Sequence, residues 1–186
     1  MIKQKVNKIW IKYAVAVAAA AVCAPALYAA SSPLASGANE RSGFRQQVLG
    51  IHNQTRQQAG VAPLQWSAEL EQGARVHAQR LANARRLFHS DGSEGSGMGE
   101  NLWAGTRGAY DVPAMFEIMV GEGRDFRPGR FPNVSRTGQW RDVGHYTQMV
   151  WPTTQKIGCA VAANASDEYL VCRYYPSGNV IGYALR

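Results

Sequence analysis

The chain has 186 residues, of which 46% are hydrophobic and 18% are charged, and this composition is typical of a globular domain rather than a disordered chain. The net charge of +7 falls to +3 without residues 1–29, because that segment holds four lysines and no acidic residue. The arginines of the remainder are scattered among thirteen acidic residues and form no basic stripe, which argues against a nucleic-acid partner.

Residues 1–29 have the pattern of a secretory signal peptide: a basic head, a short apolar run and small residues at its end. Ala24-Pro25-Ala26 fits the cleavage rule, and cleavage after Ala29 or Ala30 fits as well. The alternative is an uncleaved membrane anchor, although the run is rich in alanine and near the lower length limit for a bilayer span. We therefore expect a secreted or periplasmic protein with no stable membrane insertion once the leader is removed.

A flexible arm and a first helix are expected after the leader. Residues 30–41 are mostly small and polar and include proline and glycine, a composition typical of a flexible segment. Ser42 then provides a cap for a helix that runs through about Gln58, with apolar residues spaced three and four apart. Gly60 supplies the residue that ends this helix.

Two more helices and a glycine-rich segment follow. Ser67 is expected to cap a second helix that reaches the region of Phe88. The segment HSDGSEGSGMGENLWAG, residues 89–105, is rich in glycine and serine and is expected to form a loop. A third helix is expected from Asp111, with Pro113 in its first turn.

The C-terminal part is predicted to be a β-hairpin. The apolar runs KIGCAVAA and EYLVCRYYP are separated by a turn-forming cluster at residues 164–167. Folding at that turn places Cys159 opposite Cys172 if the hairpin has no bulge. An even number of cysteines after leader removal predicts a disulfide in an exported chain, and two buried free thiols are the alternative.

Four stretches together resemble the CAP superfamily of cysteine-rich secretory proteins, insect venom antigens and plant pathogenesis-related proteins, also called SCP-domain proteins. They are HNQTR at 52–56, GENLW at 99–103, GHYTQMVW at 144–151 and YLVCRYYPSGNV at 169–180. The resemblance covers residues 42–186. It implies an α+β fold, a three-layer α-β-α sandwich with a small, mainly antiparallel sheet between helices, in a single exported domain.

The resemblance also implies a cleft with two histidines and two glutamates, which match His89, Glu100, Glu122 and His145. Glu122 is matched on the third helix, although Met119 stands where the family usually has tryptophan. Neutral imidazoles bind divalent ions, so His89 and His145 are candidate ligands for Zn²⁺ or another divalent metal. The alternatives are a structural polar network, a catalytic metal site and a histidine-dependent hydrolase that uses Ser90.

Three further residues are expected to line or support the cleft. Asn101 is expected to fix the GENL segment through backbone hydrogen bonds, and Tyr146 and Gln148 are candidates for the cleft wall. His52 and His77 are interpreted as structural: His52 in a network that joins the first helix to the sheet, together with Asn53 and Arg56, and His77 in the core.

The favoured function is an exported binding module rather than an enzyme. Its His/Glu cleft would hold a divalent metal, and the family resemblance adds a lipid or sterol, or a host or extracellular protein, as partners. The alternatives are a histidine- or metal-dependent hydrolase or peptidase, and a structural or host-interaction protein with a non-catalytic cleft. No HExxH helix and no G-x-S-x-G elbow occurs to support an enzyme of those classes.

Overall fold

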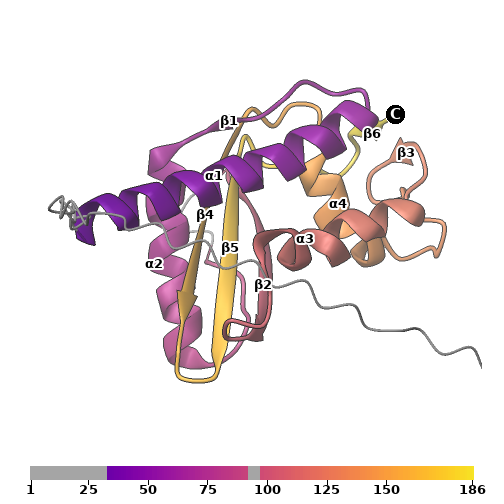
Figure 1. Cartoon of the computed structure of the whole chain (residues 1–186). Coiled ribbons are helices and arrows are strands. Elements are labelled where there is room, and N and C mark those ends of the chain that lie inside the picture. The colour runs from indigo at the N-terminus through magenta and orange to yellow at the C-terminus, as the bar shows by residue number, and fades with distance from the viewer. Residues whose placement is uncertain (1–32, 92–96) are drawn as a thin grey trace, which may run out of the picture. The chain divides into compact units, whose positions relative to one another are not determined.

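The computed structural model describes residues 33–91 and 97–186, so the expected signal peptide at 1–29 lies outside the described residues. The helices and strands of the described residues are drawn in Figure 1. The longer helices are α1 (Pro33–Gln58), α2 (Ala68–Ala84), α3 (Val112–Gly121) and α4 (Gly144–Met149), with 3-10 turns η2 (Glu122–Arg124) and η3 (Trp140–Val143). The strands are β1 (Gln65–Trp66), β2 (Gly99–Thr106), β3 (Gly129–Arg130), β4 (Lys156–Ala163), β5 (Asp167–Tyr175) and β6 (Ala184–Leu185).

The main sheet has four strands in the order β1-β4-β5-β2, and β3 and β6 form a separate pair. β5 runs antiparallel to both neighbours, whereas β1 runs parallel to β4. The β4–β5 hairpin pairs Cys159 with Cys172, and the two residues form a disulfide. The predicted hairpin, its register and its disulfide are therefore confirmed.

Helices cover both faces of this sheet, as a three-layer α-β-α sandwich requires (Figure 1). Side chains alternate along β5: Val171 packs toward α2, and Leu170 and Tyr174 pack toward the other helices. The α2 face is filled by the alanines Ala74, Ala78 and Ala82 of the helix together with Leu81. The opposite face is filled by Val48, Met115, Phe116, Met119, Met149 and Val150 from α1, α3 and the α4 region.

The N-terminal expectation is wrong in part, because α1 begins at Pro33 and not after Ser42. Residues 33–41, expected to be a flexible arm, are therefore helical, and residues 30–32 lie outside the described part of the chain. Proline is well tolerated in the first helical turn, where its missing N–H is not needed. Ser42 lies inside the helix and does not cap it.

The motif HNQTR anchors α1 to the rest of the domain, as predicted. Asn53 exchanges two hydrogen bonds with the backbone of Leu64. The buried Arg56 guanidinium donates to the carbonyls of Met149, Trp151 and Thr154, and also to Ala62. Burial lowers the pKa of Arg56 to about 10, so the side chain stays charged at neutral pH. The motif is structural because its polar atoms satisfy backbone groups of distant loops.

The cap that the sequence predicts for the second helix is confirmed, whereas the predicted end of that helix is wrong. Ser67 accepts a hydrogen bond from the backbone N–H of Leu70, and Asp111 caps α3 in the same way. α2 ends at Ala84 and not near Phe88, because Arg85 adopts a left-handed conformation with φ of 55°.

The GENLW segment is wrongly predicted as loop, since it forms most of the edge strand β2. Its register against β5 is continuous from Gly99 to Thr106, and that pairing outweighs the low strand propensity of glycine. The first six residues of the next motif, GHYTQMVW, form helix α4. Glu122 lies one residue beyond the end of α3, in the turn η2.

Candidate functional site

The edge strand β2 supports the site from both of its faces. Glu100 shares a face with Leu102 and points toward α2, whereas Asn101 shares the other face with Trp103 and points toward α4. Two successive residues therefore reach opposite layers of the sandwich. The two histidines of the site come from those layers and meet at this edge of the sheet.

The first half of the site is built around the Glu100 carboxylate, which is almost fully buried. Its Oε1 lies 3.0 Å from Nδ1 of His89 and accepts the backbone N–H of Ser90, and its Oε2 accepts the Ser90 hydroxyl. Nε2 of His77 and Nε of Arg173 each lie 3.8 Å from Oε2. The carboxylate is thus surrounded by donors and positive charge.

These contacts shift both pKa values of the pair. Burial alone would raise the pKa of Glu100, but the hydrogen bonds from His89 and Ser90 and the charge of His77 together hold it below its usual value. The hydrogen bond to Glu100 raises the pKa of His89 and outweighs its partial burial. The pair therefore favours an ionised carboxylate and holds a proton on His89 to higher pH than an isolated imidazole.

The second half of the site is built around Glu122. Its Oε1 lies 2.6 Å from Nδ1 of His145, and its Oε2 accepts the backbone N–H groups of His145 and Tyr146 at 2.9 and 3.0 Å. Glu122 thus orients the imidazole and caps the start of α4 with one side chain. On the opposite side of the same residue, the Asn101 amide donates to the carbonyl of His145.

Both imidazoles line one cleft of about 750 Å³. The described residues that line it with His89 and His145 are Ser90, Met98, Gly99, Glu100, Asn101, Trp140, Arg141, Gly144, Gln148, Ser177, Gly178 and Asn179. Of the residues expected in or near the cleft, Glu122 and Tyr146 are not part of its wall. Glu122 holds His145 from behind, and Tyr146 packs against Phe126 and Gly123.

Gln148 lies at the cleft wall and joins two segments. Its side chain is buried, and its Oε1 accepts the backbone N–H of Gly178. A side chain at Gly99 would collide with this carboxamide, which explains why the GENL segment begins with glycine. Gln148 therefore fixes the C-terminal loop over α4.

Sequence reasoning missed the C-terminal loop and η3 as walls of the cleft. Asn179 has a φ of 56°, donates to the carbonyl of Gly144 and accepts the hydroxyl of Thr147. Arg141 stacks over the ring of Trp140. The only local signal for the loop is the turn-forming run PSGN, which does not say what the turn covers.

Each imidazole of the cleft keeps one nitrogen of the kind that ligates divalent metal ions. A carboxylate only accepts, so Nδ1 carries the hydrogen in both imidazoles and Nε2 keeps its lone pair when the ring is neutral. Neither Nε2 has a hydrogen-bond partner among the described residues. Within the same part of the chain, no group of three or more His, Cys, Asp or Glu side chains is placed to hold a metal ion.

The geometry does not set up Ser90 as a nucleophile. Its hydroxyl donates to Oε2 of Glu100 and is not hydrogen-bonded to an imidazole. A serine nucleophile needs a base that accepts its hydroxyl proton, and the nearest imidazole uses its Nδ1 on the same carboxylate.

Known proteins are similar to this chain in sequence and in fold. A human protein, Golgi-associated plant pathogenesis-related protein 1, is 36% identical over 143 residues, which cover 74% of this chain and 86% of that protein. Secreted protein RBT4 of Candida albicans is 34% identical over 161 residues, which cover 82% of this chain and 41% of the relative. Secretion is thus documented among the relatives.

A solved structure supports the same relationship. The crystal structure of NaASP2 with Zn²⁺ matches with a TM-score of 0.65 and 25% identity, over 76% of this chain and 84% of that one. In the described part of this chain, no helix has the length and apolar character needed to cross a bilayer. The model of the cysteine-rich secretory protein family matches residues 49–174, and the chain therefore belongs to the CAP family.

Proposed function

We propose that this protein is an exported CAP-domain binding module whose cleft binds a divalent metal ion through Nε2 of His89 and Nε2 of His145. The observation that carries the proposal is the pair of carboxylates, Glu100 and Glu122, each on the Nδ1 atom of one imidazole. Such carboxylate–histidine pairs fix the tautomer and orient the free nitrogen for a metal.

A solved structure of a similar protein supports this proposal. The crystal structure of NaASP2 is described with Zn²⁺, and that protein is 25% identical to this chain over the matched region. Two imidazoles are fewer protein ligands than a structural zinc site uses, so water or an oxygen-bearing ligand would complete the coordination. A bound ion would thus supply open positions at which the cleft could hold such a ligand.

The chain's own residues set the pH range of binding. Metal and proton compete for Nε2, and Glu100 raises the pKa of His89. Zinc affinity is therefore expected to weaken as the pH falls from neutrality, beginning at a pH above the usual imidazole range.

Isothermal titration calorimetry with zinc chloride tests the proposal. Wild-type protein should bind one equivalent, and His89→Ala and His145→Ala should each abolish or strongly weaken the heat. Arg141→Ala is the matched control, since it alters the cleft wall but keeps both imidazoles. Equal heats in the wild type and both histidine variants would refute the metal site and leave the His/Glu contacts as a structural network.

Lipid or sterol binding is a second proposal, favoured by an apolar hollow of about 370 Å³ between α1 and α3. It is lined by Ile51, Pro113, Ala114, Phe116, Glu117 and Val120, and Ile118 on α3 is 68% exposed. Mass spectrometry of an organic extract of the purified protein would reveal a retained lipid. An extract free of lipid, together with failure to bind added fatty acid or sterol, would reject this proposal.

A further inference from the structure

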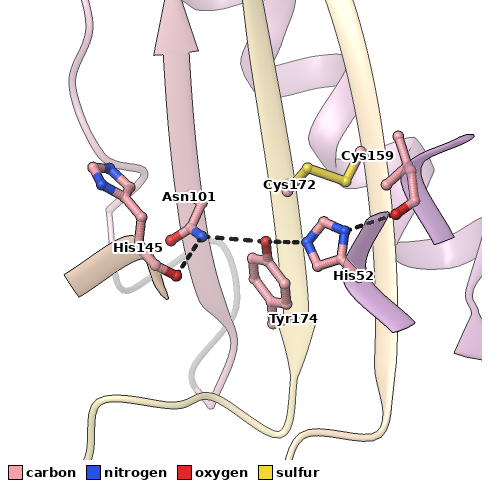
Figure 2. Close-up of a disulfide and its surroundings, with 7 residues drawn as sticks. His52, Asn101, His145, Cys159, Cys172 and Tyr174 are labelled. Carbon is pink, nitrogen blue, oxygen red and sulfur yellow. Dashed lines mark hydrogen bonds between the residues drawn. A yellow bond between two sulfur atoms is a disulfide. The ribbon is translucent and has the colours of Figure 1, made fainter. Parts of the chain in front are cut away.

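A chain of buried hydrogen bonds crosses the core from α1 to the carbonyl of His145 (Figure 2). Nδ1 of His52 lies 2.8 Å from the Val48 carbonyl, and Nε2 of His52 lies 2.9 Å from the Tyr174 hydroxyl. Nδ2 of Asn101 donates to that hydroxyl at 3.2 Å and to the carbonyl of His145 at 3.1 Å. The chain thus joins α1, β5, β2 and α4, which are far apart in the sequence.

The hydrogen bond between His52 and the Val48 carbonyl determines which group donates and which accepts in every other bond of this series. A backbone carbonyl only accepts, so Nδ1 of His52 carries the hydrogen. Burial, aided by the charge of Arg56, lowers the pKa of His52 to about 4, although the bond to Val48 opposes this. The ring is therefore neutral, and its Nε2 accepts the hydrogen of the Tyr174 hydroxyl.

The consequence reaches Asn101. Because the Tyr174 hydroxyl uses its hydrogen on His52, it offers only lone pairs to Asn101, which must present its NH₂ group. The other hydrogen of that NH₂ group then meets the carbonyl of His145. His52 and Tyr174 are fully buried and Asn101 is 2% exposed, so water has little access to replace a lost partner.

We propose that Tyr174 and His52 are positioning residues for the cleft imidazole of His145, acting through the amide of Asn101. Glu122 holds the N–H side of residue 145, and Asn101 holds its C=O side. The two contacts together fix the backbone from which the imidazole projects. The use of zinc affinity as a readout rests on the proposed function, but the positioning itself does not.

Tyr174→Phe is the test, because it removes one hydroxyl and keeps the ring. Tyr169→Phe is the matched control: Tyr169 is a buried tyrosine of the same strand, but it packs in the core on the α2 face. In metal-free protein, the imidazole resonances of His145 in Tyr174→Phe should shift or broaden in ¹H–¹³C spectra, whereas those of His89 should not. Zinc affinity should fall by about tenfold in Tyr174→Phe, the low end of losses from such supporting partners, and stay unchanged in Tyr169→Phe.

The two readouts separate the two proposals. If wild-type protein binds no zinc, the proposed function fails, and the metal-free spectra still decide the positioning role. If the His145 resonances of Tyr174→Phe match those of the wild type, the positioning role is wrong. Should Tyr174→Phe fail to fold, Asn101→Ala tests the last link of the chain, since it removes the donor to the His145 carbonyl without burying a charge.

Discussion

The two halves of the cleft use the same chemistry but are held very differently. The side chain of His89 is 69% exposed, and its contact with Glu100 is the one hydrogen bond found for it in the described chain. The side chain of His145 is 38% exposed, and residue 145 is held by Glu122 at two atoms and by Asn101 at a third. Residue 145 is thus tied to its surroundings at more atoms than the imidazole of His89.

The two halves differ in which groups hydrogen-bond to each oxygen of the carboxylate. Glu100 uses one oxygen, Oε1, for both the imidazole of His89 and the backbone of Ser90. Glu122 uses Oε1 for the imidazole of His145 and Oε2 for two backbone N–H groups. Both carboxylates therefore hold an imidazole and backbone beside it, but only Glu122 keeps a separate oxygen for the backbone.

Acidification should separate the two halves most strongly. The folded-state pKa of His52 is lowered to about 4, so between pH 6.5 and 4 the unfolded chain takes up a proton that the folded chain excludes. The stability that neutral His52 provides is complete above pH 6.5 and falls by about 2 kcal/mol at pH 5 and about 3 kcal/mol at pH 4. The positioning chain of His145 therefore weakens in acid.

The stability contributed by the His89 half of the cleft changes with pH in the opposite direction over this range. The raised pKa of His89 makes its contact with Glu100 fully effective below pH 6.5, and that contribution is lost as the pH rises through the raised value. The lowered pKa of Glu100 keeps the carboxylate effective until the pH falls below its usual value of 4.5. Urea unfolding at pH 7 and 5, with NMR titration of the four histidines, checks both signs; a His52 that titrates near 6.5 would contradict the first.

Replacing each carboxylate by its amide should give the next largest contrast. In Glu122→Gln, the amide oxygen can keep both backbone bonds, but its NH₂ group then faces Nδ1 of His145 and moves the imidazole hydrogen to Nε2. Zinc affinity should fall by about 10–100-fold, because Nε2 loses its lone pair. Calorimetry measures this loss, and imidazole ¹⁵N shifts report the change of tautomer without metal.

Glu100→Gln is the matched variant in the other half. Its amide oxygen can serve His89 and the backbone of Ser90 together, while its NH₂ group faces the Ser90 hydroxyl, which can accept. The tautomer of His89 is then retained, so the loss of zinc affinity should be less than about tenfold. Equal losses in the two variants would show that charge, not tautomer, governs the cleft.

The smallest effects are expected from removing each imidazole in the absence of metal. His145→Ala should lower the free energy of unfolding by about 1 kcal/mol, because it removes a hydrogen bond to a nearly buried carboxylate. His89→Ala should change it by less than about 0.5 kcal/mol, since the ring is largely exposed and Ser90 still donates a hydrogen bond to each oxygen of Glu100. Chemical denaturation measures both; a larger cost for His89→Ala would overturn the contrast between the halves.

Features that depend on neighbouring residues could be predicted from the sequence. The caps at Ser67 and Asp111 and the β4–β5 hairpin with its disulfide follow from local hydrogen bonding and from the alternation of apolar residues. The resemblance carried by four short motifs predicted the family, and it implied His89 and His145 as site residues. The caps, the hairpin and the motifs can each be recognised from a short stretch of the sequence.

The contacts that support those residues depend on how distant parts of the chain pack together. The bond between His52 and Tyr174 spans 122 positions, and that between Asn101 and Tyr174 spans 73, so no local period or motif records them. The strand character of GENLW depends on pairing with β5, and the role of Glu122 depends on α4 folding back onto the end of α3. A buried polar group must take its partner from whatever chain packs beside it, and that neighbour is known only once the layers are assembled.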